Sequence, residues 1–362
     1  MALLIDVSTA SPPYVLSQTA AAAGLKQRMG GGAVIGRMID AAASRSGITT
    51  RRVVVPDAEP DVQEPFYALS PEGPHPDTAR RMDLYRQWSA RLAVEACSTL
   101  LEKTGTAPAS VDRLITVSCT GFSAPNFDHH IITRLGLPAT VTRTHIGFMG
   151  CAAAVVGMTS ALEASRDPAH RNILLVAVEL CSLHLQPEPT RDNILANMIF
   201  ADGCAAALFS SDPDRGGKLR LLRTHSLLFE NSNEMMGWEI GNHGFQMMLS
   251  PLLPDIIAQQ AAPAAKKILS EHQIPPEKIS HWALHPGGRA ILDALQTGLG
   301  LSEEQTAPSR SVLNRFGNMS SASILFVMKA LRERSRIQPG ELLCAIAFGP
   351  GLTMELALFE GV

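Results

Sequence analysis

The sequence predicts an α/β protein, because short apolar runs alternate with amphipathic segments and Gly, Pro, Asp or charged residues separate the two. The apolar runs have the length and punctuation of buried strands. The segments between them carry apolar residues three and four positions apart, as helices do. The predicted strands are residues 113–118, 173–180, 204–210, 282–285, 342–348 and 353–359. The predicted helices are residues 152–165, 254–271, 288–298 and 321–334.

The order of these segments hints at an internal duplication. RLITVSCTG and HWALHPGG open two blocks that each continue to a final apolar strand. The polar run DPDRGG, residues 212–217, is turn-forming and is the best candidate for a joint. We therefore divide the chain into an N-terminal half, residues 1–216, and a C-terminal half, residues 217–362.

Composition limits the classes of protein that the chain can be. Its 362 residues are 46% hydrophobic and 18% charged, enough for a sizeable core. A net charge of −3 without basic runs gives no reason to expect nucleic acid. The sequence lacks a long apolar stretch, and its start, MALLIDVSTASPP, lacks a basic leader, so we expect no membrane segment and a cytoplasmic location.

Cys151 is the cysteine whose surroundings suggest chemistry. The six cysteines fall singly, without metal-ligand spacing, so we expect reduced thiols and no metal site. Cys151, in FMGCAAAVVGM, lies where a strand that ends near Gly147 gives way to a helix. The positive end of a helix favours a thiolate, which makes Cys151 a candidate nucleophile. The alternative is a buried structural cysteine, which is the commoner case.

Two further junctions carry a histidine and an asparagine. His285 ends a strand before Pro-Gly-Gly, where α/β sheets place ligands, although His281 shares its strand face and one of the two can be structural. Asn318, in GNMSSAS, could donate hydrogen bonds to a developing oxyanion or simply cap a helix. Papain-like proteases share the order Cys, His, Asn, but Cys151 lacks their flanking residues and lies far from the N-terminus.

Four ordered motifs carry a family resemblance across essentially the whole chain: GCAAAVVGM, LHPGGRAILDAL, GNMSSAS and FGPGLTMELALF. The chain resembles type III polyketide synthases, the chalcone-synthase-like enzymes of the thiolase superfamily. The resemblance implies a thiolase-like five-layered αβαβα fold of two pseudo-duplicated halves. It also implies a homodimer whose interface runs through GFSAPNF.

The resemblance implies the chemistry as well. Cys151 would take an acyl starter from a coenzyme A thioester, and decarboxylated malonyl-CoA would extend it by Claisen condensation. His285 would stabilise the thiolate as an imidazolium and then, with Asn318, donate hydrogen bonds to the thioester oxygen. Repeated extension and cyclisation would give a pyrone, resorcinol or chalcone-like product. No metal or organic cofactor is implied, and an acyl carrier protein stays open as a second carrier.

Further site residues follow from the resemblance alone. The gatekeeper phenylalanines fall on Phe200 and Phe245. The other expected cavity residues are Ala124, Cys181, His184, Met236, Ser320 and Pro350. The expected coenzyme A contacts are Arg37, Arg45, Gly287, Gly288, Arg289 and Ala290, although each arginine fits a solvated surface charge equally well.

Two other functions share parts of this pattern. A 3-ketoacyl-acyl-carrier-protein synthase III has the Cys, His, Asn set and the fold and condenses once, but GNMSSAS and FGPG favour the iterative family. A non-catalytic subunit of a condensing complex would be free to lose the three residues, and all three are present.

Overall fold

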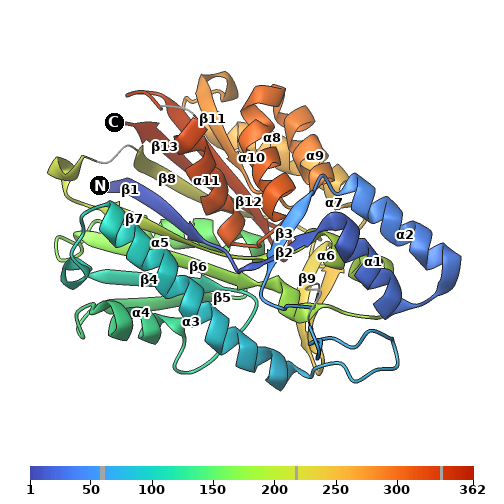
Figure 1. Ribbon diagram of the computed structural model, residues 1–362. Coiled ribbons are helices and arrows are strands. Elements are labelled where there is room, and N and C mark those ends of the chain that lie inside the picture. The colour runs from blue at the N-terminus through green and yellow to red at the C-terminus, as the bar shows by residue number, and fades with distance from the viewer. Residues whose placement is uncertain (58–61, 217–218, 335–336) are drawn as a thin grey trace.

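The apolar runs of the sequence join one mixed sheet of nine strands, in the order β11-β12-β13-β8-β1-β7-β6-β4-β5 (Figure 1). The computed structural model describes residues 1–57, 62–216, 219–334 and 337–362. The strands of the sheet are β1 (Ala2–Ala10), β4 (Arg113–Ser118), β5 (Thr142–Gly147), β6 (Asn172–Leu180), β7 (Asp202–Ser210), β8 (Leu219–Leu228), β11 (Ile279–Leu284), β12 (Leu342–Gly349) and β13 (Thr353–Gly361). Two hairpins stand apart, β2 (Tyr14–Ser17) with β3 (Thr50–Val53) and β9 (Met236–Gly241) with β10 (Gly244–Leu249). All six predicted strands are confirmed.

The sheet consists of two halves with one topology. From its edge inward the first half reads β5-β4-β6-β7-β1, the third, second, fourth, fifth and first strand in chain order. The second half reads β11-β12-β13-β8, which is the same order without a counterpart of β5 among the described residues. The two first strands pair antiparallel where Ala2, Leu3 and Leu4 face Leu221, Arg220 and Leu219. The duplication is therefore confirmed, and β1 and β8 form its seam.

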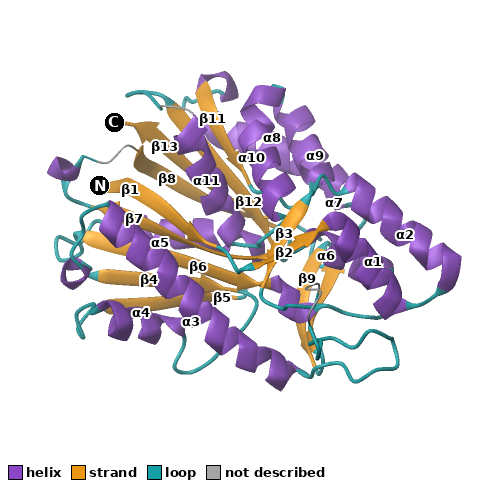
Figure 2. Ribbon diagram, in the orientation of Figure 1, coloured by secondary structure: helices purple, strands orange, loops and turns teal. Residues whose placement is uncertain are grey.

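Eleven α-helices flank and divide the described sheet (Figure 2). They are α1 (Gln18–Met29), α2 (Gly32–Arg45), α3 (Thr78–Lys103), α4 (Phe127–Leu135), α5 (Ala153–Ala164), α6 (Arg191–Ile199), α7 (Leu253–Ile256), α8 (Ala262–Glu271), α9 (Arg289–Leu299), α10 (Glu303–Phe316) and α11 (Ala322–Arg334). Helices α5 and α11 share one core with strands of both halves. Helices α3 and α4 cover the first half from outside, and α8, α9 and α10 cover the second. These are the five layers that the resemblance implied.

One predicted helix needs correction, and the predicted division of the chain stays open. The predicted helix over residues 254–271 is divided into α7, a π-helical segment (Ile257–Ala261) and α8. Pro263 at the start of α8 has no N–H to donate to the preceding turn, which is a physical reason for the irregular segment. The predicted division between residues 216 and 217 falls at residues 217–218, outside the described residues, and stays a prediction.

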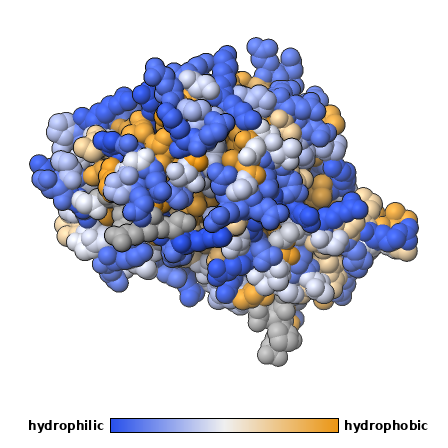
Figure 3. All heavy atoms as spheres, turned by 90° about the horizontal axis from the view of Figure 1, so that it is seen from above, coloured by the Kyte–Doolittle hydropathy of each residue, from blue (hydrophilic) through white to orange (hydrophobic). Residues whose placement is uncertain are grey.

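No helix in the described ranges is both long and apolar enough to cross a bilayer. The face in Figure 3 is mostly hydrophilic, with small hydrophobic patches between the polar side chains. All six cysteines are buried and free of disulfide bonds.

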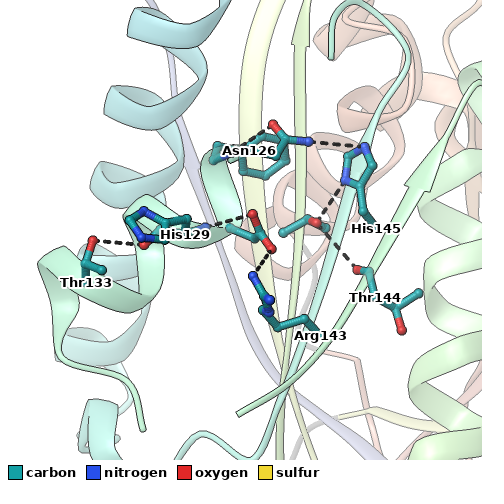
Figure 4. Close-up of polar contacts among 9 residues, drawn as sticks. Asn126, His129, Thr133, Arg143, Thr144 and His145 are labelled. Atoms are coloured by element: carbon teal, nitrogen blue, oxygen red, sulfur yellow. Dashed lines mark hydrogen bonds and ion pairs between the residues drawn. The ribbon is translucent and has the colours of Figure 1, made fainter. Parts of the chain in front are cut away.

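Strand β5 forms an open edge of the sheet, and each of its residues is at least partly exposed. Its side chains are bound to the neighbouring strand and to α4 (Figure 4). The His145 ring lies 2.9 Å from the Thr116 hydroxyl and 3.4 Å from the Asn126 amide. Arg143 donates to Asp128 at 3.0 Å. Side chains thus hold β5 in place, while its outer backbone groups have no strand partner among the described residues.

Candidate active site

Cys151 lies in a tight turn whose first residue, Gly150, has no room for a side chain. The 3-10 turn Gly150–Ala152 connects β5 with α5. Gly150 has a φ of +60°, and a Cβ at this position would lie 2.3 Å from Cδ of Pro350. The turn therefore packs directly on the loop between β12 and β13, and Cys151 within this turn is only 7% exposed.

His285 is held at the end of β11 by its backbone. Its N–H donates to the carbonyl of Ile346 at 2.8 Å, and its own carbonyl accepts from Gly287 N–H at 2.9 Å. Both ring nitrogens are buried without a hydrogen-bond partner in the described chain. His281, by contrast, lies 3.0 Å from Glu341 at the other end of the strand and lines none of the cavities described below. His281 is thus the structural histidine of the two.

Asn318 lies in the turn between α10 and α11, with its side chain fixed at both ends. Its Oδ1 accepts from Ser320 N–H at 2.8 Å, and its Nδ2 donates to the Gly287 carbonyl at 3.3 Å. Helix α11 begins only at Ala322, so Asn318 is not its N-cap and the capping alternative is wrong. The amide N–H groups are directed toward the turn that carries His285.

The structure brings the three residues to one cavity. Cys151, His285 and Asn318 all line a cavity of about 440 Å³. Phe200 and Met236 form further parts of its wall. A smaller inner chamber of about 30 Å³ adjoins Cys151 and shares Phe200 and Met236. The other residues that line this inner chamber include Cys119, Thr120, Gly150, Cys181, Trp238, Met247, Ser320 and Pro350.

Burial determines the charge state of the thiol and the imidazole. Desolvation raises the pKa of Cys151 to about 11, although hydrogen bonds from Ser320 and Asn318 act against it. Desolvation lowers the pKa of His285 to about 3. Burial thus acts against the thiolate of Cys151 and against the imidazolium of His285.

Glu179 is a site residue that the sequence reasoning missed. It lies near the end of β6, is fully buried, and accepts from Cys119 N–H at 3.0 Å, from the Thr120 hydroxyl at 2.8 Å and from Ser321. Burial raises its pKa to about 7, and its negative charge raises the pKa of Cys151. The signal in the sequence was a carboxylate inside the apolar run ILLVAVEL, because a buried carboxylate needs a specific set of donors.

Three of the expected cavity residues lie outside the cavity, and two of them, Phe245 and His184, are buried together. Phe245 is fully buried and stacks on His184 with ring centroids 4.1 Å apart, and neither lines either chamber. His184 is bound to the Thr120 carbonyl at 2.7 Å and to Phe245 N–H at 3.0 Å. The Trp238 ring packs against both and itself lines the inner chamber. Met247, two residues further along β10, lines the inner chamber in place of Phe245.

The remaining expected residues also divide into those that line a chamber and those that line neither. Phe200, Cys181, Met236, Ser320 and Pro350 line one or both chambers. Arg45, Gly287, Gly288, Arg289 and Ala290 line the larger cavity, together with Arg191, which no sequence motif marked. Ala124 and Arg37 are exposed and line neither chamber. Arg37 lies on the surface of α2, which reaches the cavity through Met38 and Arg45, and its contact with coenzyme A stays a prediction.

A buried thiol, an imidazole and an amide at one cavity of a duplicated αβαβα fold define a condensing enzyme of the thiolase-like class. The comparisons with known proteins identify its family. Residues 221–362 match the family described as chalcone and stilbene synthases, C-terminal domain. Residues 71–232 match the family described as FAE1/type III polyketide synthase-like protein. The chain belongs to the type III polyketide synthases.

Individual relatives support the same assignment. The alpha-pyrone synthesis polyketide synthase-like Pks18 of Mycobacterium tuberculosis is 32% identical over 87% of this chain and 80% of its own length. Polyketide synthase 37 of Dictyostelium discoideum is 33% identical over 78% of this chain, which spans only 10% of that much longer protein. The crystal structure of PKS-I from the brown alga Ectocarpus siliculosus has a TM-score of 0.91 and 30% identity, with 100% of this chain and 98% of that chain covered.

Proposed function

We propose that this polyketide synthase loads an acyl group from a coenzyme A thioester onto Cys151 and extends it with malonyl-CoA. Each extension is a decarboxylative Claisen condensation, and cyclisation to a pyrone, resorcinol or chalcone-like product ends the sequence. The observation that carries the proposal is the meeting of Cys151, His285 and Asn318 at one cavity.

The charge states suggest how loading begins. The buried Cys151 thiol needs a base, and the His285 imidazole can accept its proton, because it lines the same cavity and both ring nitrogens lack a hydrogen-bond partner in the described chain. The imidazolium formed by this transfer stabilises the thiolate by charge. The thiolate then attacks the thioester carbonyl, so that its S–C bond replaces the one to coenzyme A, which leaves as its thiol with the proton from the imidazolium.

Asn318 and His285 then serve the extension step. Loss of CO₂ from malonyl-CoA leaves an enolate whose oxygen needs hydrogen-bond donors. The amide of Asn318 is oriented in advance, because Ser320 N–H holds its Oδ1. One such donor is worth about 3–4 kcal/mol of barrier. Thiol, imidazole and amide supply all the groups that this chemistry needs, and we propose no metal or organic cofactor.

The rim of the cavity suits the anionic end of coenzyme A. Arg45, Arg191 and Arg289 line it. Their acidic neighbours are loosely placed, since Asp192 lies 3.7 Å from Arg191 and Asp293 lies 3.7 Å from Arg289. We propose that these arginines bind the phosphates, and that an acyl carrier protein is an alternative carrier for the same opening.

A homodimer is proposed through the face beside β5. Phe122, Phe148 and Met149 are 47%, 40% and 39% exposed, and the first two rings lie 6.4 Å apart. An apolar cluster next to an open strand edge is typical of an interface. The exposed Ala124 lies in the same segment as Phe122, where the resemblance implies contact with the partner's cavity.

The alternative functions are less well supported. The matching families and relatives are type III polyketide synthases, which disfavours a single-condensation 3-ketoacyl-acyl-carrier-protein synthase III. A non-catalytic subunit is disfavoured because the three side chains share one cavity.

The test is incubation with labelled malonyl-CoA and a panel of acyl-CoA starters, followed by mass spectrometry of the products. Wild type should give extended, cyclised products, and Cys151→Ala should give none while keeping its melting temperature. Cys97→Ala, a buried thiol of α3 away from the cavity, is the matched control and should keep activity. Product formation by Cys151→Ala at a near-normal rate would contradict the assignment.

A further inference from the structure

The wall of the cavity and the turn that carries Asn318 are joined by backbone hydrogen bonds. Phe200, the first residue after α6, lines both chambers and forms a parallel bridge with Asn318. Asn318 N–H donates to the Ile199 carbonyl at 3.0 Å, and the Asn318 carbonyl accepts from Ala201 N–H at 2.8 Å. A shift of the end of α6 would therefore move both the Phe200 wall and the Asn318 turn.

The end of α6 is held by donors from outside the helix. The last carbonyls of a helix have no partner within it. Those at the end of α6 belong to Asn197, Met198, Ile199 and Phe200. Arg51 Nη1 donates to the carbonyls of Asn197 and Phe200, at 2.6 and 2.8 Å. The Gln18 side chain donates to the Met198 carbonyl at 2.8 Å, and Asn318 N–H donates to the Ile199 carbonyl. All four carbonyls are thus satisfied, and Arg51 alone satisfies two.

Arg51 also supports the other side of this junction. It lies in β3 and is only 3% exposed. A Cβ at Gly317, the residue before Asn318, would lie 2.9 Å from Cγ and 3.0 Å from Cδ of Arg51. The aliphatic stem of Arg51 therefore packs closely against Gly317, while the guanidinium binds carbonyls at the end of α6. Burial lowers the pKa of Arg51 to about 10, and the neighbouring Asp202 acts against that shift, so the group stays charged near neutral pH.

We propose that Arg51 is a positioning residue for the condensation step. It clamps the end of α6 against the 317–318 turn, so that the Asn318 amide and the Phe200 wall keep their places relative to Cys151. Arg51 lines neither chamber itself and acts through these two residues. Cys151 is held separately, by the packing of Gly150 on Pro350, so its loading should not depend on Arg51. The proposal rests on the proposed function and adds a residue to it.

The experiment measures the two steps separately in Arg51→Met and Arg51→Lys. Loading is followed as acylation of Cys151 in a single turnover by intact-protein mass spectrometry. Condensation is followed as product formed from labelled malonyl-CoA. For Arg51→Met we expect loading within about twofold of wild type and condensation lowered about 10- to 100-fold, because a displacement near 1 Å has an effect of this size. Arg51→Lys should recover part of the rate, since an ammonium keeps the charge without the planar fork.

Arg28→Met is the matched control. Arg28 is also a buried arginine, 7% exposed, and it pairs with Asp57 at 3.1 Å but has no hydrogen bond to the end of α6. It should lower the melting temperature and leave the ratio of the two rates unchanged. An unchanged ratio in the Arg51 variants would overturn the proposal. If Arg51→Met does not fold, the ratio in Arg51→Lys decides. Failure of wild type to load Cys151 would instead refute the proposed function.

Discussion

Gly150→Ala tests whether the packing of one glycine places the nucleophile. Gly150 has a φ of +60°, which costs a residue with a side chain about 1–2 kcal/mol. The new Cβ would also lie 2.3 Å from Cδ and 3.0 Å from Cγ of Pro350. Carbon atoms prefer separations of about 3.5–4.0 Å, so the overlap requires a shift of roughly 1 Å. The proline ring is rigid, and the shift therefore falls largely on the turn that holds Cys151.

Gly136→Ala separates the two contributions. Gly136 ends α4 with a φ of +73°, and a Cβ added there would have no other atom within 4 Å. It therefore carries the backbone strain without the clash. We expect Gly136→Ala to lose about 1–2 kcal/mol of stability and to keep its activity. Gly150→Ala should lose at least as much stability and also lose activity about 100-fold, the effect of a displacement near 1 Å in an active site.

The assay combines thermal denaturation, steady-state product formation and the rate at which iodoacetamide alkylates Cys151. The alkylation rate reports the position and access of the sulfur independently of substrate binding. Wild-type activity in Gly150→Ala, or equal losses of activity in the two variants, would refute the reasoning that Pro350 fixes the turn.

Three other changes test the remaining parts of the site. Asn318→Ala should lower condensation about 100- to 1,000-fold, as loss of an oxyanion donor does, while single-turnover loading of Cys151 continues. Glu179→Gln removes a negative charge that disfavours the thiolate, so the alkylation profile of Cys151 should shift to lower pH. Met247→Phe narrows an inner chamber of about 30 Å³ and should reduce the number of malonyl extensions, measured as product mass.

Each of these changes has a control in the same element or nearby. Asn314→Ala removes an exposed amide of α10 that binds the 47–49 loop. It should leave the ratio of the loading rate to the condensation rate unchanged. Glu163→Gln changes an exposed carboxylate of α5 and should leave the alkylation profile in place. Met248→Phe alters the next residue of β10, which is 40% exposed, and should leave product length unchanged. Equal effects of a variant and its control would contradict the corresponding prediction.

The strands could be predicted because they are buried on both faces. The run ILLVAVEL, for example, is buried throughout β6, so its hydrophobicity marks it without any knowledge of its neighbours. The edge strand β5, TRTHIG, has no buried residue and therefore no such signal. The hairpin of β9 and β10 was missed for a similar reason, because most of its residues are at least partly exposed and only Met236, Gly237, Gly244 and Phe245 are buried.

The site was predictable only where a motif carries its own backbone requirement. Gly150 before Cys151 and the glycines after His285 reflect local turns, and those turns can be read from neighbouring residues. Glu179 and Arg51 act through partners more than a hundred residues away, such as Ser321 and Phe200, and no local pattern encodes those contacts. The expectation for Phe245 came from the family pattern alone, and the structure surrounds this ring with His184 and Trp238 instead of the cavity.

The missing counterpart of β5 among the described residues makes the two ends of the sheet unequal. One end presents a strand in which every residue is at least partly exposed, and the other ends in β11, which is buried at four of its six positions. If two copies join through β5, this strand is no longer an open edge in either copy. The described sheet of the pair then has no second edge strand that is exposed along its whole length. Association of this type closes at two copies instead of continuing into a filament. The shorter second half would thus limit how far the protein can assemble.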